Sequence, residues 1–155
     1  MVRMRDGVRL ATDVYLPNHP TRHAAIFWRT PYDKCGRYIA LPQRAGHYNE
    51  RGYVLVAQDC RGKFRSEGET LPYTLDIEDS YDTLDWITSQ PWSNGRVGLL
   101  GGSYSGYTVW AGVASGHPAV RAAIPQVTGT DLAVDGGYSA MGPEMAEPAI
   151  PKLMS

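Results

Sequence analysis

Residues 101–106 hold the side chain with the clearest capacity for chemistry, the hydroxyl of Ser103. The apolar run 97–100 predicts a strand, and residues 107–115 predict a helix. Only a few small residues are left to turn the chain between them. A strand-to-helix turn this sharp holds its central side chain out at the end of the sheet, which is the geometry of a nucleophile elbow. The stretch therefore favours Ser103 as a nucleophile.

The spacing of small residues around Ser103 leaves three interpretations open. Gly101 and Ser105 are small enough for neighbouring backbone to pass close by, but glycine comes at Gly106, one residue later than G-x-S-x-G requires. The stretch also resembles a dinucleotide-binding fingerprint without its middle glycine. Such a fingerprint follows the first strand and has an acidic residue about 20 positions further on. No carboxylate occurs between Ser103 and Asp131, which argues against it. The third interpretation is a glycine-rich turn that carries an ordinary serine.

Length and composition narrow the class of protein. The chain has 155 residues and a formal net charge of −1, which suits one domain without a strongly basic face, so nucleic acid is not an expected partner. No apolar run approaches the roughly 18 residues of a membrane span, and the first residues do not form a secretory signal. Cys35 and Cys60 are too few for a disulfide framework. We expect two free thiols in a reducing, cytoplasmic compartment, with a single bridge between them as the alternative.

Strands and helices are expected to alternate along the chain. Residues 8–16 alternate in polarity, which predicts a half-buried strand, and the turn at Asp6 and Gly7 pairs it with residues 1–5. The other predicted strands are 24–29, 53–58, 96–100 and 120–127, and the predicted helices are 42–51, 76–89 and 107–115. This order predicts an α/β fold with a mostly parallel sheet of about six strands and an antiparallel start.

Two local expectations concern the middle of the chain. The predicted helix 76–89 is amphipathic, and its acidic first turn suits the helix dipole. Its expected buried stripe consists of Ile77, Tyr81, Leu84 and Thr88, with Asp79 largely off it. A turn is expected at residues 93–95, before the strand that leads to the serine.

Four segments resemble CocE/NonD-type hydrolases, the family of cocaine esterases, α-amino acid ester hydrolases and X-prolyl dipeptidyl aminopeptidases. They occur in the family's order, over roughly residues 1–131: MRDGVRLA at 4–11, RTPYDK at 29–34, DCRG at 59–62 with SEG at 66–68, and GGSYSG at 101–106. In this family the nucleophile elbow has the pattern G-x-S-Y-x-G. The position of Gly106, one residue later than in G-x-S-x-G, agrees with this pattern. The resemblance implies the α/β-hydrolase fold and a serine hydrolase that cleaves ester or amide bonds through an acyl-enzyme.

The resemblance also implies roles for individual residues. Ser103 is similar to the family's nucleophile, the backbone N–H of Tyr104 to one oxyanion donor, and the hydroxyl of Tyr32 to the second. The plain alternative for Tyr32 is a packed aromatic ring with its hydroxyl in water. Asp59 and Arg61 are expected to be structural and to hold the strand-end loop through charge-assisted hydrogen bonds. The resemblance implies no cofactor and no metal ion.

A general base for the serine is not evident in the sequence. A serine needs a histidine held by a carboxylate, and in α/β-hydrolases both follow the serine in the chain. The histidines are His19, His23, His47 and His117. The first two are expected to be solvated in a loop, and His47 is expected to lie on a helix with a surface or packing role. We therefore expect a fragment that is inactive alone: residues 1–131 as the N-terminal part of a hydrolase domain, and 132–155 as the start of a cap or an irregular tail, without the family's C-terminal β-sandwich.

The sequence leaves two functions open. The first is a serine hydrolase whose partner is a small-molecule ester, an acylated amino acid or a short peptide, with neither nucleic acid nor membrane involved. The second is a non-catalytic binding or assembly module. In either case the last strand, 120–127, is expected to form an open sheet edge that allows self-association.

Overall fold

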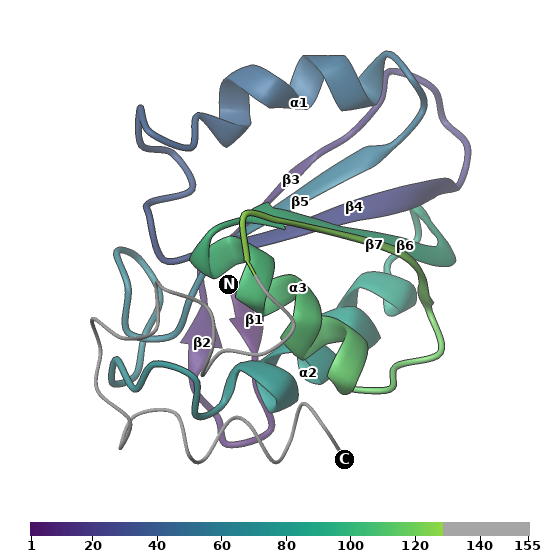
Figure 1. Ribbon diagram of the computed structural model, residues 1–155. Helices are drawn as coiled ribbons and strands as arrows, with labels where there is room; N and C mark the ends of the chain where they lie inside the picture. Colours follow the sequence, from purple (N-terminus) through teal and green to yellow (C-terminus); the bar gives the residue numbers. More distant parts are fainter. Residues whose placement is uncertain (129–155) are drawn as a thin grey trace.

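The computed structural model describes residues 1–128, so the expectation for residues 132–155 lies outside the described residues. A sheet of five strands forms the centre of the molecule (Figure 1), and two short strands form a separate antiparallel pair. In chain order the elements are β1 (Val2–Arg3), β2 (Arg9–Leu10), β3 (Thr12–Tyr15), β4 (His23–Thr30), α1 (Leu41–Asn49), β5 (Val54–Asp59), α2 (Asp76–Ser89), β6 (Ser93–Gly102), α3 (Tyr104–Ala114) and β7 (Val120–Gln126).

The order of strands in the main sheet is β3-β5-β4-β6-β7. β3 runs antiparallel to β5, whereas β4, β5, β6 and β7 are mutually parallel. The mostly parallel sheet with an antiparallel start is therefore confirmed. Because β4 and β6 are parallel neighbours, the segments that follow their carboxyl ends meet at one edge of the sheet.

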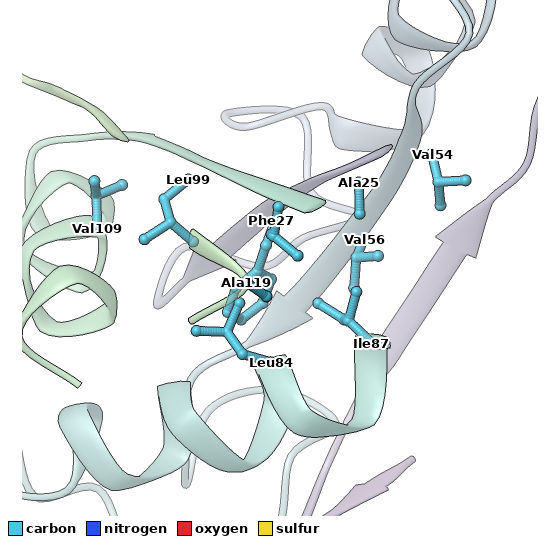
Figure 2. Packing of buried hydrophobic residues seen from close by; sticks show 10 residues of the cluster. Ala25, Phe27, Val54, Val56, Leu84, Ile87, Leu99, Val109 and Ala119 are labelled. Carbon is cyan, nitrogen blue, oxygen red and sulfur yellow. The ribbon is translucent and has the colours of Figure 1, made fainter. Parts of the chain in front are cut away.

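Helices cover both faces of this sheet, with α1 on one face and α2 and α3 on the other (Figure 1). On the α2–α3 face, Leu84 and Ile87 of α2 pack toward Phe27 and Val56 of the sheet (Figure 2), and all four are buried. Burying a side chain of this size contributes roughly 1.5–3 kcal/mol. None of the helices within residues 1–128 is both long and apolar enough to span a bilayer.

The strand predicted at 8–16 is two strands, so residues 1–128 contain seven strands where about six were expected. The ladder breaks at Ala11, whose N–H donates to Ser66 Oγ at 2.9 Å. β2 therefore pairs with β1, while β3 crosses to pair with β5. The predicted turn at 93–95 is also wrong, since β6 already begins at Ser93. Gly95 lies within this strand and has a positive φ of 79°, which is unusual for a strand residue.

The buried face of α2 differs from the predicted stripe. The helix bounds are as expected, but its buried residues are Asp76, Asp79, Ser80, Thr83, Leu84 and Ile87. Of the predicted stripe only Leu84 is among them. The polar side faces inward because two arginines from other segments, Arg29 and Arg61, meet its carboxylates there. Periodicity of apolar residues alone cannot anticipate a face that is buried through ion pairs.

His23 was expected in solvent and is buried instead. It is the first residue of β4, and its ring nitrogens lie 2.9 Å from the carbonyl oxygen of Gly52 and 3.0 Å from that of His19. Backbone carbonyls at the start of the strand therefore supply the hydrogen bonds that water would otherwise make. His19 itself is exposed, as predicted, and His47 lies exposed on α1, which is the surface role of the two expected for it.

Candidate active site

Ser103 is the single residue between β6 and α3, so the strand turns directly into the helix. Its backbone adopts φ 57° and ψ −128°, a region that L-residues rarely occupy and that costs on the order of 1–3 kcal/mol. Hydrogen bonds hold it there: its N–H donates to the carbonyl oxygen of Gln126 at 2.9 Å, and the N–H of Gly106 donates to its carbonyl oxygen at 2.8 Å. The side chain is exposed at the edge of the sheet.

The small residues around the turn are required by close contacts with backbone and side-chain atoms. A Cβ on Gly101 would lie 2.3 Å from the carbonyl oxygen of Ser105, and one on Gly106 would lie 2.5 Å from Cγ2 of Thr128. Real Cβ atoms do not approach other atoms this closely. The glycines at 101 and 106 thus allow the strand, the turn and the helix to pack against each other.

Tyr32 reaches the same point from the segment that follows β4. Its hydroxyl donates to Ser103 Oγ at 3.1 Å and accepts a hydrogen bond from the backbone N–H of Tyr104 at 3.2 Å. The structure therefore brings together the three residues that the sequence singled out, and the Tyr32 hydroxyl faces the serine. An oxygen placed beside Ser103 Oγ would have an O–H and an N–H donor within reach.

Tyr32 is held in place from both sides. Its own N–H donates to Thr30 Oγ1 at 3.1 Å, and two residues further on the N–H of Lys34 donates to Asp59 Oδ1 at 2.9 Å. The buried ammonium of Lys34 lies 3.3 Å from Asp59 and 3.2 Å from Asp13. Burial alone would lower the pKa of Lys34, but the Asp59 and Asp13 carboxylates outweigh it and raise that pKa. Asp59 thus has a structural contact, as expected.

Tyr104 is anchored through its side chain. Its phenol donates to Asp76 Oδ2 at 3.1 Å and accepts from the N–H of Tyr73 at 3.1 Å, and the rings of Tyr73 and Tyr104 are stacked. Asp76 also lies 3.5 Å from the buried guanidinium of Arg29. Burial raises the pKa of Asp76, with Arg29 opposing the rise, and burial together with Asp76 raises the pKa of Tyr104. Tyr104 is therefore a neutral phenol.

This anchoring network was not evident from the sequence. The sequence indicated Arg29 as the end of a strand and the start of the RTPYDK segment, and Asp76 as part of an acidic helix start. The one available signal was the presence of an arginine within an otherwise apolar strand, because a buried charge needs a partner. Arg61 is structural, as expected: it donates to Asp79 at 2.6 and 3.0 Å and to Asp6 at 2.7 Å.

The site contains no histidine within residues 1–128. His23 begins β4, and His117 contacts Asp85 at 3.0 Å and stacks edge-on against Tyr81. No hydrogen bond joins any of the four histidines to Ser103 in this part of the chain. The described residues also include no group of three histidine, cysteine or acidic side chains placed to hold a metal ion. Cys35 and Cys60 are free thiols, as predicted.

Comparison with known proteins gives consistent matches. The family model described as X-Pro dipeptidyl-peptidase (S15 family) matches residues 6–149. The chain is 42% identical over 134 residues to cocaine esterase from Rhodococcus sp. (strain MB1 Bresler), covering 85% of this chain and 23% of the relative.

Solved structures agree with this match. A selenomethionine-labelled α-amino acid ester hydrolase superposes with a TM-score of 0.72 at 36% identity, over 81% of this chain and 24% of that one. A CocE/NonD family hydrolase from Staphylococcus aureus gives a TM-score of 0.72 at 28% identity, over 80% and 26%. The chain thus spans about a quarter of the length of these relatives. The predicted α/β-hydrolase fold and the CocE/NonD resemblance are confirmed.

Proposed function

Because this chain belongs to the X-Pro dipeptidyl-peptidase (S15) family, we propose that Ser103 is the nucleophile of a serine hydrolase that cleaves ester or amide bonds. Its homologues are esterases and related hydrolases, which supports a hydrolase function. The observation that carries the finer proposal is the convergence of the Tyr32 hydroxyl and the Tyr104 N–H beside Ser103 Oγ, at 3.1 and 3.2 Å.

In the proposed reaction, Ser103 Oγ attacks the carbonyl carbon of the substrate and a general base takes its proton. The carbonyl oxygen becomes an oxyanion and accepts hydrogen bonds from the Tyr32 O–H, which leaves Ser103 Oγ, and from the Tyr104 N–H, which leaves the Tyr32 oxygen. Collapse of the tetrahedral intermediate breaks the bond to the leaving group, which receives the proton, and leaves an acyl group on Ser103. Water then attacks the acyl-enzyme by the same steps and releases the acid.

We propose that the base is a histidine from a part of the natural protein outside residues 1–128. The family order of serine, then acid, then histidine supports this, as does the placement of the four histidines of this chain away from Ser103. Candidate substrates are small-molecule esters, acylated amino acids and short peptides.

Rapid-mixing kinetics with p-nitrophenyl acetate on the full-length natural protein test the proposal. An acyl-enzyme predicts a burst of nitrophenol equal to the enzyme concentration, and Ser103→Ala abolishes it. Ser105→Ala is a matched control, since the buried Ser105 hydroxyl has no hydrogen-bond partner among the described residues and its removal leaves the burst intact. A burst that persists in Ser103→Ala would exclude Ser103 as the nucleophile.

A further inference from the structure

The ring of Tyr32 has only partial support from its surroundings. It packs against the margin of the buried cluster that includes Trp28, and edge-on against Tyr38, which is itself 78% exposed. The hydroxyl lies at the far end of this ring, so a small rotation of the backbone moves it by a larger distance. Displacing a catalytic group by about 1 Å can cost on the order of 10²-fold in rate. The interactions that fix the backbone around Tyr32 therefore bear directly on the proposed oxyanion donor.

The backbone next to Tyr32 adopts an unusual conformation. Asp33 has a φ of 63°, in the left-handed region that few residues other than glycine occupy. Its carboxylate accepts a hydrogen bond from the N–H of Cys35 at 3.1 Å, and its carbonyl oxygen accepts one from the N–H of Gly36 at 2.9 Å. These bonds close the turn on itself but do not attach it to the neighbouring strands. A conformation of this kind persists only where the surrounding structure holds it.

Lys34 attaches this turn to the sheet. Its N–H donates to Oδ1 of Asp59, the last residue of β5, at 2.9 Å, and its ammonium lies 3.3 Å from Oδ2 of the same carboxylate. The ammonium also lies 3.2 Å from Oδ2 of Asp13 on β3. The strand order is β3-β5-β4, so one side chain joins the turn after β4 to both strands on that side of it. Resting on the proposed function, we propose that Lys34 is a positioning residue that holds the Tyr32 hydroxyl where the oxyanion forms.

Burial makes this attachment firm and keeps Lys34 away from the substrate. The side chains of Lys34 and Asp59 are 1% and 0% exposed, so water does not compete for either charge. Burial by itself lowers the pKa of Lys34, but the nearby carboxylates more than offset this and keep the ammonium charged. A side chain enclosed in this way does not touch the reacting atoms, so Lys34 acts only through Tyr32. Its effect on the reaction should therefore disappear when the Tyr32 hydroxyl is removed.

A double-mutant cycle on the full-length natural protein tests this role, with p-nitrophenyl acetate as the substrate. Lys34→Met keeps the length of the side chain but removes the ammonium. We expect kcat to fall about tenfold or more and KM to stay within about twofold, because the displaced donor is needed in the transition state. In a Tyr32→Phe background the same substitution should change kcat by less than about twofold, because no hydroxyl remains to be displaced. Titration of Ser103 with a fluorophosphonate counts the folded sites, so that kcat refers to competent enzyme only.

A second cycle uses Asp13→Ala, because Lys34→Met leaves the buried Asp59 carboxylate without its partner. The Asp13 side chain is 36% exposed, and its loss leaves the pair of Lys34 and Asp59 intact, so this variant keeps the fold. We expect the same pattern with a smaller fall in kcat, of about threefold or more. Arg5→Met is the matched control. It removes a cation from Asp82, outside the site, and should leave kcat within about twofold in both backgrounds.

The positioning role is overturned if Lys34→Met lowers kcat by the same factor with and without the Tyr32 hydroxyl, or if the folded variant keeps the kcat of the unaltered protein. Should Lys34→Met not fold, the same two results for Asp13→Ala decide. An unchanged kcat in Tyr32→Phe alone would refute the proposed oxyanion donor and, with it, the role of Lys34. Failure of the unaltered protein to hydrolyse the ester would instead refute the proposed function on which that role rests.

Discussion

The hydroxyl oxygen of Tyr32 lies 3.1 Å from Ser103 Oγ, although 71 positions separate the two residues in the chain. The sheet explains this proximity. Tyr32 follows the end of β4 and Ser103 follows the end of β6, and the two strands are parallel neighbours. Their carboxyl ends therefore deliver a phenol and a strained serine to one point on the edge of the sheet.

Replacing the phenol tests the role that we propose for Tyr32. Tyr32→Phe keeps the ring but removes one oxyanion donor, so kcat should fall on the order of 10²–10³-fold with little change in KM. Steady-state ester hydrolysis by the full-length protein measures both constants. Tyr38→Phe is the control, since Tyr38 packs edge-on against Tyr32 and is 78% exposed. Equal activity of Tyr32→Phe and Tyr38→Phe would contradict the role.

Much of this site could be predicted from the sequence, because its signals are local. Small residues at 101 and 105 flank the serine at a strand–helix junction, and the structure shows that Gly101 has no room for a side chain. The strand order was not local information. The family resemblance implied only that Tyr32 acts beside Ser103, and the structure explains this by placing β4 next to β6.

What the sequence did not indicate are interactions between charged residues distant in the chain. The inward face of α2 is set by Arg29 and Arg61, which lie 47 and 18 positions from Asp76 and Asp79. No periodicity within the helix specifies such partners. His23 was misassigned for a similar reason, since its burial depends on the carbonyl of Gly52, 29 positions away.

Adding a methyl group at Gly101 should destabilise the elbow. The new Cβ would lie 2.3 Å from the carbonyl oxygen of Ser105, so backbone must shift, at a cost of about 1–3 kcal/mol or more. Gly98→Ala is a matched control in the same strand, because the nearest atom to its Cβ is 4.0 Å away. Urea denaturation should show a lower midpoint for Gly101→Ala only. Equal midpoints for the two variants would show that the backbone is not closely packed at the turn.

Removing the charge of Asp76 should destabilise the protein strongly. Asp76→Asn leaves the buried Arg29 guanidinium without its carboxylate, and breaking a buried ion pair typically costs about 3–5 kcal/mol. Asp82→Asn on the same helix is the control. Its partner Arg5 is 56% exposed, and surface pairs contribute about 0–1 kcal/mol. Similar denaturation midpoints for both variants would mean that Asp76 does not compensate a buried charge.

The buried thiol of Cys60 predicts a loss of stability in alkali. Burial raises its folded-state pKa well above the ordinary value of 9.0, so above pH 9 the unfolded chain releases a proton that the folded protein retains. Stability is therefore unaffected below that pH and falls as pH rises toward the folded-state pKa, by about 1.4 kcal/mol per pH unit.

Denaturation midpoints at pH 8, 9 and 10 measure this effect. Cys60→Ala should flatten the decline. Cys35→Ala should flatten it less, because Cys35 is less buried and a nearby Lys34 ammonium opposes the rise in its pKa. If the denaturation midpoint fell equally steeply with pH in Cys60→Ala and in the unaltered protein, the Cys60 thiol would not be the cause.

Covalent labelling tests directly whether the Ser103 hydroxyl is the reacting group. A fluorophosphonate ester forms a stable adduct with an activated serine, and mass spectrometry of peptides from the labelled full-length protein locates it. We expect one adduct, on the peptide that contains Ser103, that is absent from Ser103→Ala and retained in Ser105→Ala. An adduct on a different residue, or undiminished labelling of Ser103→Ala, would contradict this expectation.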